Sequence, residues 1–488
     1  MLFNSWQFLI FLLVTFVLYF VLPKKIRHYE LLIASYFFYA FWNWKLVFLI
    51  LGTTLVSFFA GFFMVKTEKK WLKRLLLISA ILISLGVLFF FKYFDFIAES
   101  VVTVINMLNG SVKWNSLNLI LPIGISFYTF QTLSYVIDVY KGKYEPEKNF
   151  FFYALYVSFF PQLVAGPIER PENLLPQLKN QEGINTRNMS EGMVLMLIGY
   201  IKKIVIADMI GIYVNNIFSN ILETNGLLIL VGTLLFSVQI LCDFSGYSDI
   251  AKGVAKMFNI DLMVNFNHPY KSESIKEFWS RWHISLSSWL RDYVYIPLGG
   301  NRVKLPRWIL NILIVFLISG IWHGANWTYV IWGLMHGVLQ VIERLIHPLI
   351  LKGCEKKGVN YNKSIFRILR IVLTFTLVAL TWIPFRSNNL SDMVNAYRIL
   401  FTSWRFNSQY FDTFNAFIPM TAFNIVFILL GLVLFNLIDY LPRLRFNEKT
   451  SGYILRKGVY VVGICLVMFC FIYLQNIDVK TSFIYFQF

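Results

Sequence analysis

The sequence predicts an all-α protein that crosses a membrane many times, and three observations carry this prediction. Hydrophobic residues make up 57% of the 488 residues, charged residues only 14%, and the mean hydropathy is +0.61. Soluble domains are less apolar and more highly charged than this. Apolar runs long enough to cross the hydrocarbon core as helices recur along the chain. The short alternating segments that are typical of a membrane β-barrel are missing from the sequence.

In chain order, the first apolar run has neither a basic n-region nor a small-residue cleavage site, so we expect a retained span rather than a signal peptide. Several later runs are short or interrupted by polar residues, and we expect about ten to thirteen crossings. The candidate spans lie at 6–22, 29–44, 46–64, 74–94, 118–137, 150–166, 191–218, 226–248, 306–322, 326–343, 366–385, 417–438 and 456–475.

The net charge of +18 is distributed as loop clusters rather than as one basic patch. Basic residues gather at 24–27, 66–74 and 141–148, which are alternate loops between the expected spans. This bias predicts that these loops face the cytoplasm and contact anionic membrane lipids, with the N-terminus outside, and it argues against nucleic acid as a partner. The four cysteines have no metal-ligand or disulfide-framework spacing.

Proline and glycine interrupt two of the spans. Pro122 and Gly124 lie inside the span at 118–137, where we expect a kink or a break beside a cavity. The prolines of the segment 160–171 predict a rigid turn that ends the span at 150–166 at the membrane surface.

Titratable residues in apolar surroundings are the candidate functional groups. Lys202 and Lys203 are either interfacial anchors that snorkel or cations for a donor that carries phosphates. Asp243 and Asp249 either orient a histidine or belong to a buried network. We expect no metal site, because the histidines and acids lack a recognised ligand spacing.

An amphipathic helix is predicted from about Ser274 onward. At 100° per residue, Trp279 and five other apolar residues share one face, so the helix suits the membrane interface or the roof of a cavity. His283 lies at the edge of that face and is expected to point inward, as a structural or a functional group. The apolar face comprises Trp279, Trp282, Leu286, Trp289, Leu290 and Tyr293.

His323 lies between two apolar runs, in the segment Ser319–Trp327. An ionisable group at membrane depth is costly and by default functional, although packing against a neighbouring helix is an equal alternative for a lone histidine. Asn326 is expected near Trp322 in helical projection, either as a hydrogen-bonding group or in a packing role. His268 and His336 are weaker candidates.

Four segments together resemble the signature blocks of membrane-bound O-acyltransferases, and most closely their bacterial alginate O-acetyltransferase branch. The blocks occur in the family's order and are supported by the turn at 166–171 and the terminal segment at 483–488. They are Asp243–Asp249, Phe278–Ser287, Arg291–Gly300 and Trp322–Ala325.

The resemblance implies a single membrane-embedded acyltransferase domain in a bacterial cytoplasmic membrane, with N-terminal spans at 1–117, a catalytic core at 118–345 and C-terminal spans at 346–488. It implies a ring of tilted helices around a tunnel that joins a cytoplasmic thioester donor, such as acetyl-CoA, to an extracytoplasmic polysaccharide. His323 matches the family's catalytic histidine and His283 its second functional position. Members of the branch commonly work with an extracytoplasmic SGNH-hydrolase-like enzyme or a small membrane partner.

These residue types suit acyl transfer, because an imidazole near neutral pH can take the proton of an attacking hydroxyl. We expect His323 to be that base, His283 to orient a substrate or stabilise the oxyanion, and Trp322 and Trp327 to exclude water. The absence of a serine or cysteine nucleophile in the motif favours direct transfer over an acyl-enzyme. A transporter or flippase for a glycan or lipid-linked precursor, D-alanyl transfer to teichoic acid, and a non-catalytic scaffold are the alternatives.

Overall fold

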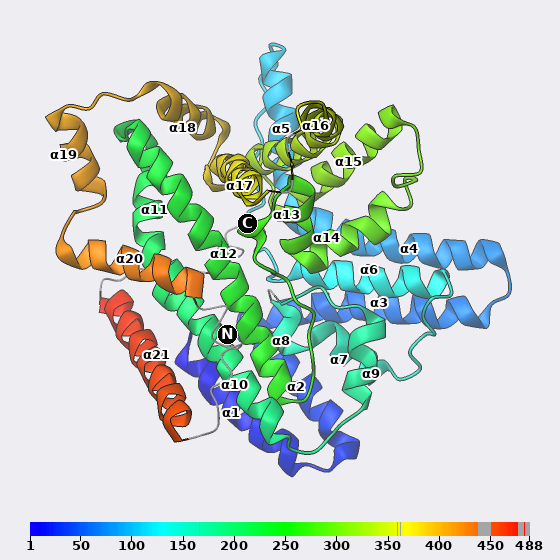
Figure 1. Ribbon diagram of the computed structural model, residues 1–488. Helices are drawn as coiled ribbons and strands as arrows, with labels where there is room; N and C mark the ends of the chain where they lie inside the picture. The colour runs from blue at the N-terminus through cyan, green and yellow to red at the C-terminus, as the bar shows by residue number, and fades with distance from the viewer. Residues whose placement is uncertain (165, 359, 362, 438–449, 477–482, 484–488) are drawn as a thin grey trace. The chain divides into compact units, whose positions relative to one another are not determined.

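The computed structural model describes the chain except for residues 165, 359, 362, 438–449, 477–482 and 484–488. The described residues form helices and loops and no β-strand, so the predicted all-α class is confirmed. Figure 1 traces these helices in chain order. Their bounds are α1 Trp6–Val21, α2 Arg27–Ala40, α3 Val47–Lys66, α4 Lys70–Leu88, α5 Phe94–Met107, α6 Ile125–Tyr140, α7 Phe150–Ser158, α8 Phe160–Leu163, α9 Pro171–Lys179, α10 Thr186–Tyr200, α11 Met209–Ser219, α12 Gly226–Met257, α13 Ile275–Arg281, α14 Ile284–Leu290, α15 Leu305–His323, α16 Trp327–Lys356, α17 Ser364–Arg386, α18 Leu390–Thr402, α19 Ser408–Phe417, α20 Ala422–Leu437 and α21 Thr450–Asn476.

Every predicted span coincides at least in part with a helix, and the described residues contain six helices long and apolar enough to cross a membrane on their own. Large apolar side chains on several helices are exposed, as contact with lipid requires. The chain is therefore a polytopic membrane protein, while the count of ten to thirteen crossings stays a prediction. The six helical stretches are Trp44–Lys66, Lys70–Met107, Gly226–Met257, Leu305–His323, Trp327–Lys356 and Ser364–Arg386.

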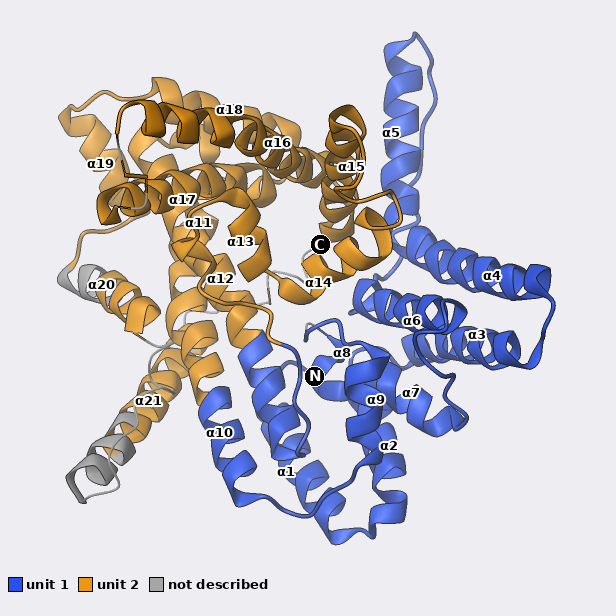
Figure 2. Cartoon of the chain, turned by 45° about the vertical axis from the view of Figure 1, so that its right-hand side comes forward, with its two compact units in different colours: residues 1–196, 248–263 blue, residues 197–247, 264–488 orange. Residues whose placement is uncertain are grey.

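The chain forms two compact units, 1–196 with 248–263 and 197–247 with 264–488 (Figure 2). The boundary between the two units falls inside α10 and α12. The single acyltransferase domain with a catalytic core at 118–345 stays a prediction. The ring around a tunnel stays a prediction.

In the first unit, α6 packs against α3 and α4 and is buried along nearly its whole length. This helix begins only at Ile125, because Gly124 adopts a left-handed φ of 74° and a side chain there would overlap the backbone oxygen of Leu163. The span predicted at 118–137 is therefore wrong at its start. The span predicted at 150–166 is likewise broken, into α7 and α8.

The proline-rich turn at 166–171 is buried within the protein, and its place at the membrane surface stays a prediction. Glu169 is fully buried and accepts hydrogen bonds from the Met263 backbone N–H at 2.6 Å and the Asn173 amide at 2.7 Å. Burial raises the pKa of the Glu169 carboxyl to about 7, against the opposing effect of these hydrogen bonds.

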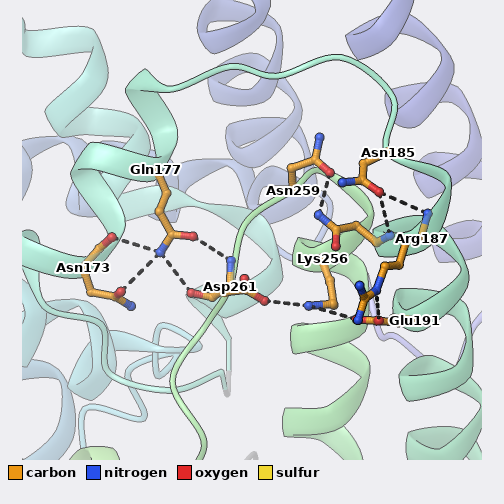
Figure 3. Close-up of polar contacts among 9 residues, drawn as sticks. Asn173, Gln177, Asn185, Arg187, Glu191, Lys256, Asn259 and Asp261 are labelled. Atoms are coloured by element: carbon orange, nitrogen blue, oxygen red, sulfur yellow. Dashed lines mark hydrogen bonds and ion pairs between the residues drawn. The ribbon is translucent and has the colours of Figure 1, made fainter.

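A polar network ties α9 and α10 to the C-terminal end of α12 (Figure 3). The Gln177 carbonyl accepts from the Asp261 backbone N–H at 2.7 Å, and Lys256 pairs with Asp261 at 3.0 Å and with Glu191 at 3.3 Å. These contacts link sequence-distant segments within the first unit.

Candidate active site

His323 is the last residue of α15, at the point where α15 and α16 cross closely. Glycines permit this approach, because a Cβ on Gly320 would overlap the Tyr329 backbone oxygen and one on Gly333 would overlap the Phe316 backbone oxygen. The His323 side chain is thereby buried between two helices.

His283 occupies a strained turn rather than a helix. The predicted continuous amphipathic helix is wrong, because α13 ends at Arg281, and His283 takes a left-handed conformation with φ 42° and ψ 55° before α14 begins. Asn265 holds the turn, since its backbone oxygen accepts from the Ile284 N–H at 3.0 Å and its side chain from the Ser285 N–H at 3.3 Å. Such strain in a non-glycine residue is common at functional sites.

The second unit brings the two predicted histidines together from segments 40 residues apart in the chain. Their ring centroids lie 6.4 Å apart, and Trp322 contacts both rings, at 5.6 Å from His283 and 5.0 Å from His323. The side chains are 0% and 2% exposed, respectively. Burial lowers the pKa of His283, which lies outside the six candidate spans, to about 3, so this imidazole is neutral at physiological pH.

Aromatic side chains that the sequence analysis missed complete the surroundings of the two rings. Trp332 of α16 and Phe385 of α17 contact His323 at centroid distances of 4.8 and 5.5 Å, and Phe244 of α12 contacts His283 at 4.7 Å. Trp327, by contrast, is 48% exposed and does not enclose the site as expected. No local pattern marks Trp332 or Phe385, because their role depends on helix packing.

His336 has a structural environment. Its Nδ1 accepts from the Trp279 indole N–H at 3.3 Å, and its Nε2 lies 2.9 Å from the Thr381 hydroxyl. An indole is only a donor, so Nδ1 is the unprotonated nitrogen and Nε2–H donates to Thr381, whose own proton goes to the Val378 backbone oxygen. This series of hydrogen bonds orients the side chain of Trp279, a candidate substrate contact, through its indole N–H.

Lys203 lies in a buried ion triad, so its interpretation as a snorkelling anchor is wrong. Its ammonium is 2.8 Å from Asp208 and 2.5 Å from Asp243, and all three side chains are less than a tenth exposed. Lys203 and Asp208 lie in a π-helical stretch, Ile201–Asp208, and Asp243 lies on α12. Asp243 thus belongs to a buried network, one of its two predicted roles, and Lys202 is buried as well.

Asn326 caps α16. Its side-chain oxygen accepts from the Thr328 backbone N–H at 3.0 Å, and its amide donates to the Asn388 backbone oxygen at 2.8 Å. The Asn326 side chain therefore caps α16 and ties its start to the loop between α17 and α18. In the described part of the chain, no group of three or more histidine, cysteine or acidic side chains is arranged to hold a metal ion.

The terminal segment at 483–488, part of the resemblance, lies outside the described residues except for Phe483. That residue stacks on Tyr247 at 4.6 Å and contacts Phe244 at 5.9 Å. Through Phe244 it reaches the surroundings of His283.

Comparison with known proteins shows which family the chain resembles. A model of the membrane-bound O-acyltransferase family matches residues 147–376, which contain both histidines. The peptidoglycan O-acetyltransferase of Helicobacter pylori is 38% identical over 428 residues, covering 80% of this chain and 78% of that protein. The probable alginate O-acetylase of Pseudomonas aeruginosa is 38% identical over 409 residues, covering 82% and 75%. The teichoic acid D-alanyltransferase of Bacillus subtilis is 30% identical over 283 residues, covering 54% and 67%.

Proposed function

Because the chain belongs to the membrane-bound O-acyltransferase family and is an O-acyltransferase, we propose that it transfers acetyl groups from cytoplasmic acetyl-CoA toward hydroxyls of an extracytoplasmic polysaccharide. The observation that carries this proposal is the convergence of His283 and His323 in a buried aromatic site. Two imidazoles brought together by a strained turn and a helix end suit proton transfer better than packing.

In the proposed reaction, the acceptor oxygen attacks the thioester carbonyl carbon while His323 takes the hydroxyl proton. The carbon–sulfur bond then breaks, and His323 returns the proton to the departing thiolate, which leaves as the free thiol. His283, neutral because of its burial, orients the acceptor through a hydrogen bond. Trp322 and the neighbouring aromatic rings keep water from the thioester.

The relatives support an acetyl group more strongly than D-alanine. The two acetylating relatives are 38% identical over at least 80% of this chain, whereas the D-alanyltransferase is 30% identical over 54% of it. We extend the proposal to a bacterial cytoplasmic membrane and to an extracytoplasmic SGNH-hydrolase-like or small membrane partner that completes transfer to the polysaccharide.

The test reconstitutes the purified full chain in lipid vesicles with acetyl-CoA, a cell-surface polysaccharide and a candidate SGNH-hydrolase-like partner, and measures acetyl transfer and thiol release. We expect His323→Ala to lower transfer by at least about 10²-fold, the usual contribution of a general base, and His283→Ala to lower it as well. His347→Ala, on the exposed part of α16, is the matched control and should leave transfer unchanged.

Full transfer by folded His323→Ala protein would refute the assignment of the base. No thioester turnover by the wild type, together with movement of a glycan across the vesicle, would instead establish the transporter.

A further inference from the structure

Trp332 lies at the centre of the aromatic surroundings of His323. Its side chain is 0% exposed, its ring is nearly perpendicular to the His323 imidazole at 4.8 Å, and it stacks on Trp382 at 5.8 Å. His336, itself held by two hydrogen bonds, also contacts the Trp332 ring, at 5.1 Å. A group bound against His323 therefore borders the Trp332 ring, and packing holds that ring in one orientation.

The indole N–H of Trp332 has no hydrogen-bond acceptor among the described residues. Leaving a buried donor unbonded costs about 1–3 kcal/mol. Two other buried indoles of the second unit do have acceptors, because Trp279 donates to His336 and Trp308 donates to the Tyr295 hydroxyl at 2.9 Å, whereas Trp282 is unbonded like Trp332. An indole N–H only donates, so the missing partner must be an acceptor atom.

Two neighbouring hydroxyls share this property. Thr328 is fully buried one helical turn before Trp332, and Ser319 is buried one turn before His323, and neither hydroxyl has a partner in the described chain. Side chains four residues apart share a helix face, so each hydroxyl lies on the face of its helix that carries Trp332 or His323. Unbonded polar groups at this one place indicate a polar ligand.

We propose that the Trp332 indole N–H donates a hydrogen bond to the carbonyl oxygen of the acyl thioester. The inference rests on the proposed function, because it takes a thioester as the group bound against His323. The carbonyl oxygen gains negative charge as the acceptor oxygen bonds to the carbonyl carbon, and it returns to a carbonyl as the carbon–sulfur bond breaks. A donor fixed by packing in a water-excluded site stabilises that charge without reorganisation.

The alternative acceptor atom is the oxygen of the attacking hydroxyl. The carbonyl is favoured because Trp332 is an uncharged donor that loses no proton, whereas the attacking hydroxyl needs a base. His323, which contacts the Trp332 ring at 4.8 Å, is the base in the proposed reaction. The two ligand atoms can be distinguished experimentally.

The experiment measures binding of two unreactive analogues to the purified full chain in detergent. Acetonyl-CoA keeps a carbonyl beside the sulfur-linked methylene, and S-propyl-CoA has the same chain without the oxygen. We expect Trp332→Phe to weaken acetonyl-CoA binding about 5–10-fold, the effect of one lost hydrogen bond, and to change S-propyl-CoA binding less than about twofold. Trp308→Phe removes a bonded indole N–H from α15 and should alter neither.

If folded Trp332→Phe protein binds both analogues equally more weakly, or binds both as tightly as the wild type, the assignment of Trp332 as the donor to the carbonyl oxygen is overturned, and the proposed function is not. If the wild type binds neither analogue, the CoA donor itself is wrong and the inference falls with it. Thermal unfolding of each variant establishes that it is folded.

Discussion

Replacing Lys203 by methionine is expected to destabilise the protein strongly, because Lys203 is the cation that pairs with two buried carboxylates. Its ammonium lies 2.8 Å from Asp208 and 2.5 Å from Asp243, and the three side chains are 4%, 7% and 2% exposed. Methionine has a similar length and removes only the charge. Removing one partner of a buried ion pair costs about 3–5 kcal/mol, since the opposite charge stays buried and unpaired.

Removing the charge of one carboxylate should lower the free energy of unfolding less than removing the charge of Lys203. The triad has two carboxylates for one ammonium, so Asp243→Asn leaves a neutral Lys203–Asp208 pair. We expect a loss of about 1 kcal/mol, comparable with one hydrogen bond. The double variant Lys203→Met/Asp243→Asn should be less destabilised than the sum of the two single variants, because it leaves one buried carboxylate rather than two.

The assay is thermal or denaturant unfolding in detergent, followed by tryptophan fluorescence. Lys256→Met is the matched control, because Lys256 also pairs with two carboxylates, Glu191 and Asp261, but these are 44% and 74% exposed. We expect this control to lose less than about 1 kcal/mol. The reasoning is refuted if the Lys203 and Lys256 variants unfold alike, or if Asp243→Asn costs more than Lys203→Met.

Two further predictions concern a buried carboxyl of the first unit and the contact between α15 and α16 in the second. Burial places the pKa of Glu169 at about 7 in the fold, above its ordinary 4.5, so the folded state binds more protons between these values and stability falls as pH rises through this window. Glu169→Gln should remove this pH dependence. Relative to the wild type, the free energy of unfolding of the variant should therefore rise by an amount on the order of 3 kcal/mol between pH 5 and pH 8. Parallel pH profiles of unfolding for the two proteins would contradict this. Gly333→Ala should destabilise by about 1–3 kcal/mol because its Cβ meets backbone atoms of α15, whereas Gly353→Ala, on the same helix with open space, should be neutral in thermal unfolding.

The two histidines show which features of the site can be predicted from the sequence. An imidazole in an apolar run is visible from residue type alone, and His283 and His323 were selected in this way and by the family's blocks. Helical periodicity also predicts that His283 faces inward, and it is fully buried. Periodicity failed for its backbone, because contacts with Asn265, far away in the chain, hold the residue in the left-handed turn.

The lysines also show a limit of prediction from sequence. Composition marks Lys203 as unusual, but the choice between an interfacial anchor and a buried group depends on whether a carboxylate lies opposite. One carboxylate, Asp208, is five residues away in the same stretch, but the second, Asp243, lies 40 residues later on another helix. Helix packing, which local sequence does not encode, brings the two charges together.

The sequence by itself determined the fold class, the membrane setting, the family and the two histidines, because each follows from residue types summed over a segment or from a block of neighbouring residues. Only the tertiary structure decided that the histidine rings lie 6.4 Å apart, that α13 and α14 are separate, and that Trp332 borders His323. The physical reason is that these features depend on which helix faces meet. Around the two histidines, this packing depends on glycines that let α15 and α16 come into contact and on aromatic side chains from α12, α16 and α17.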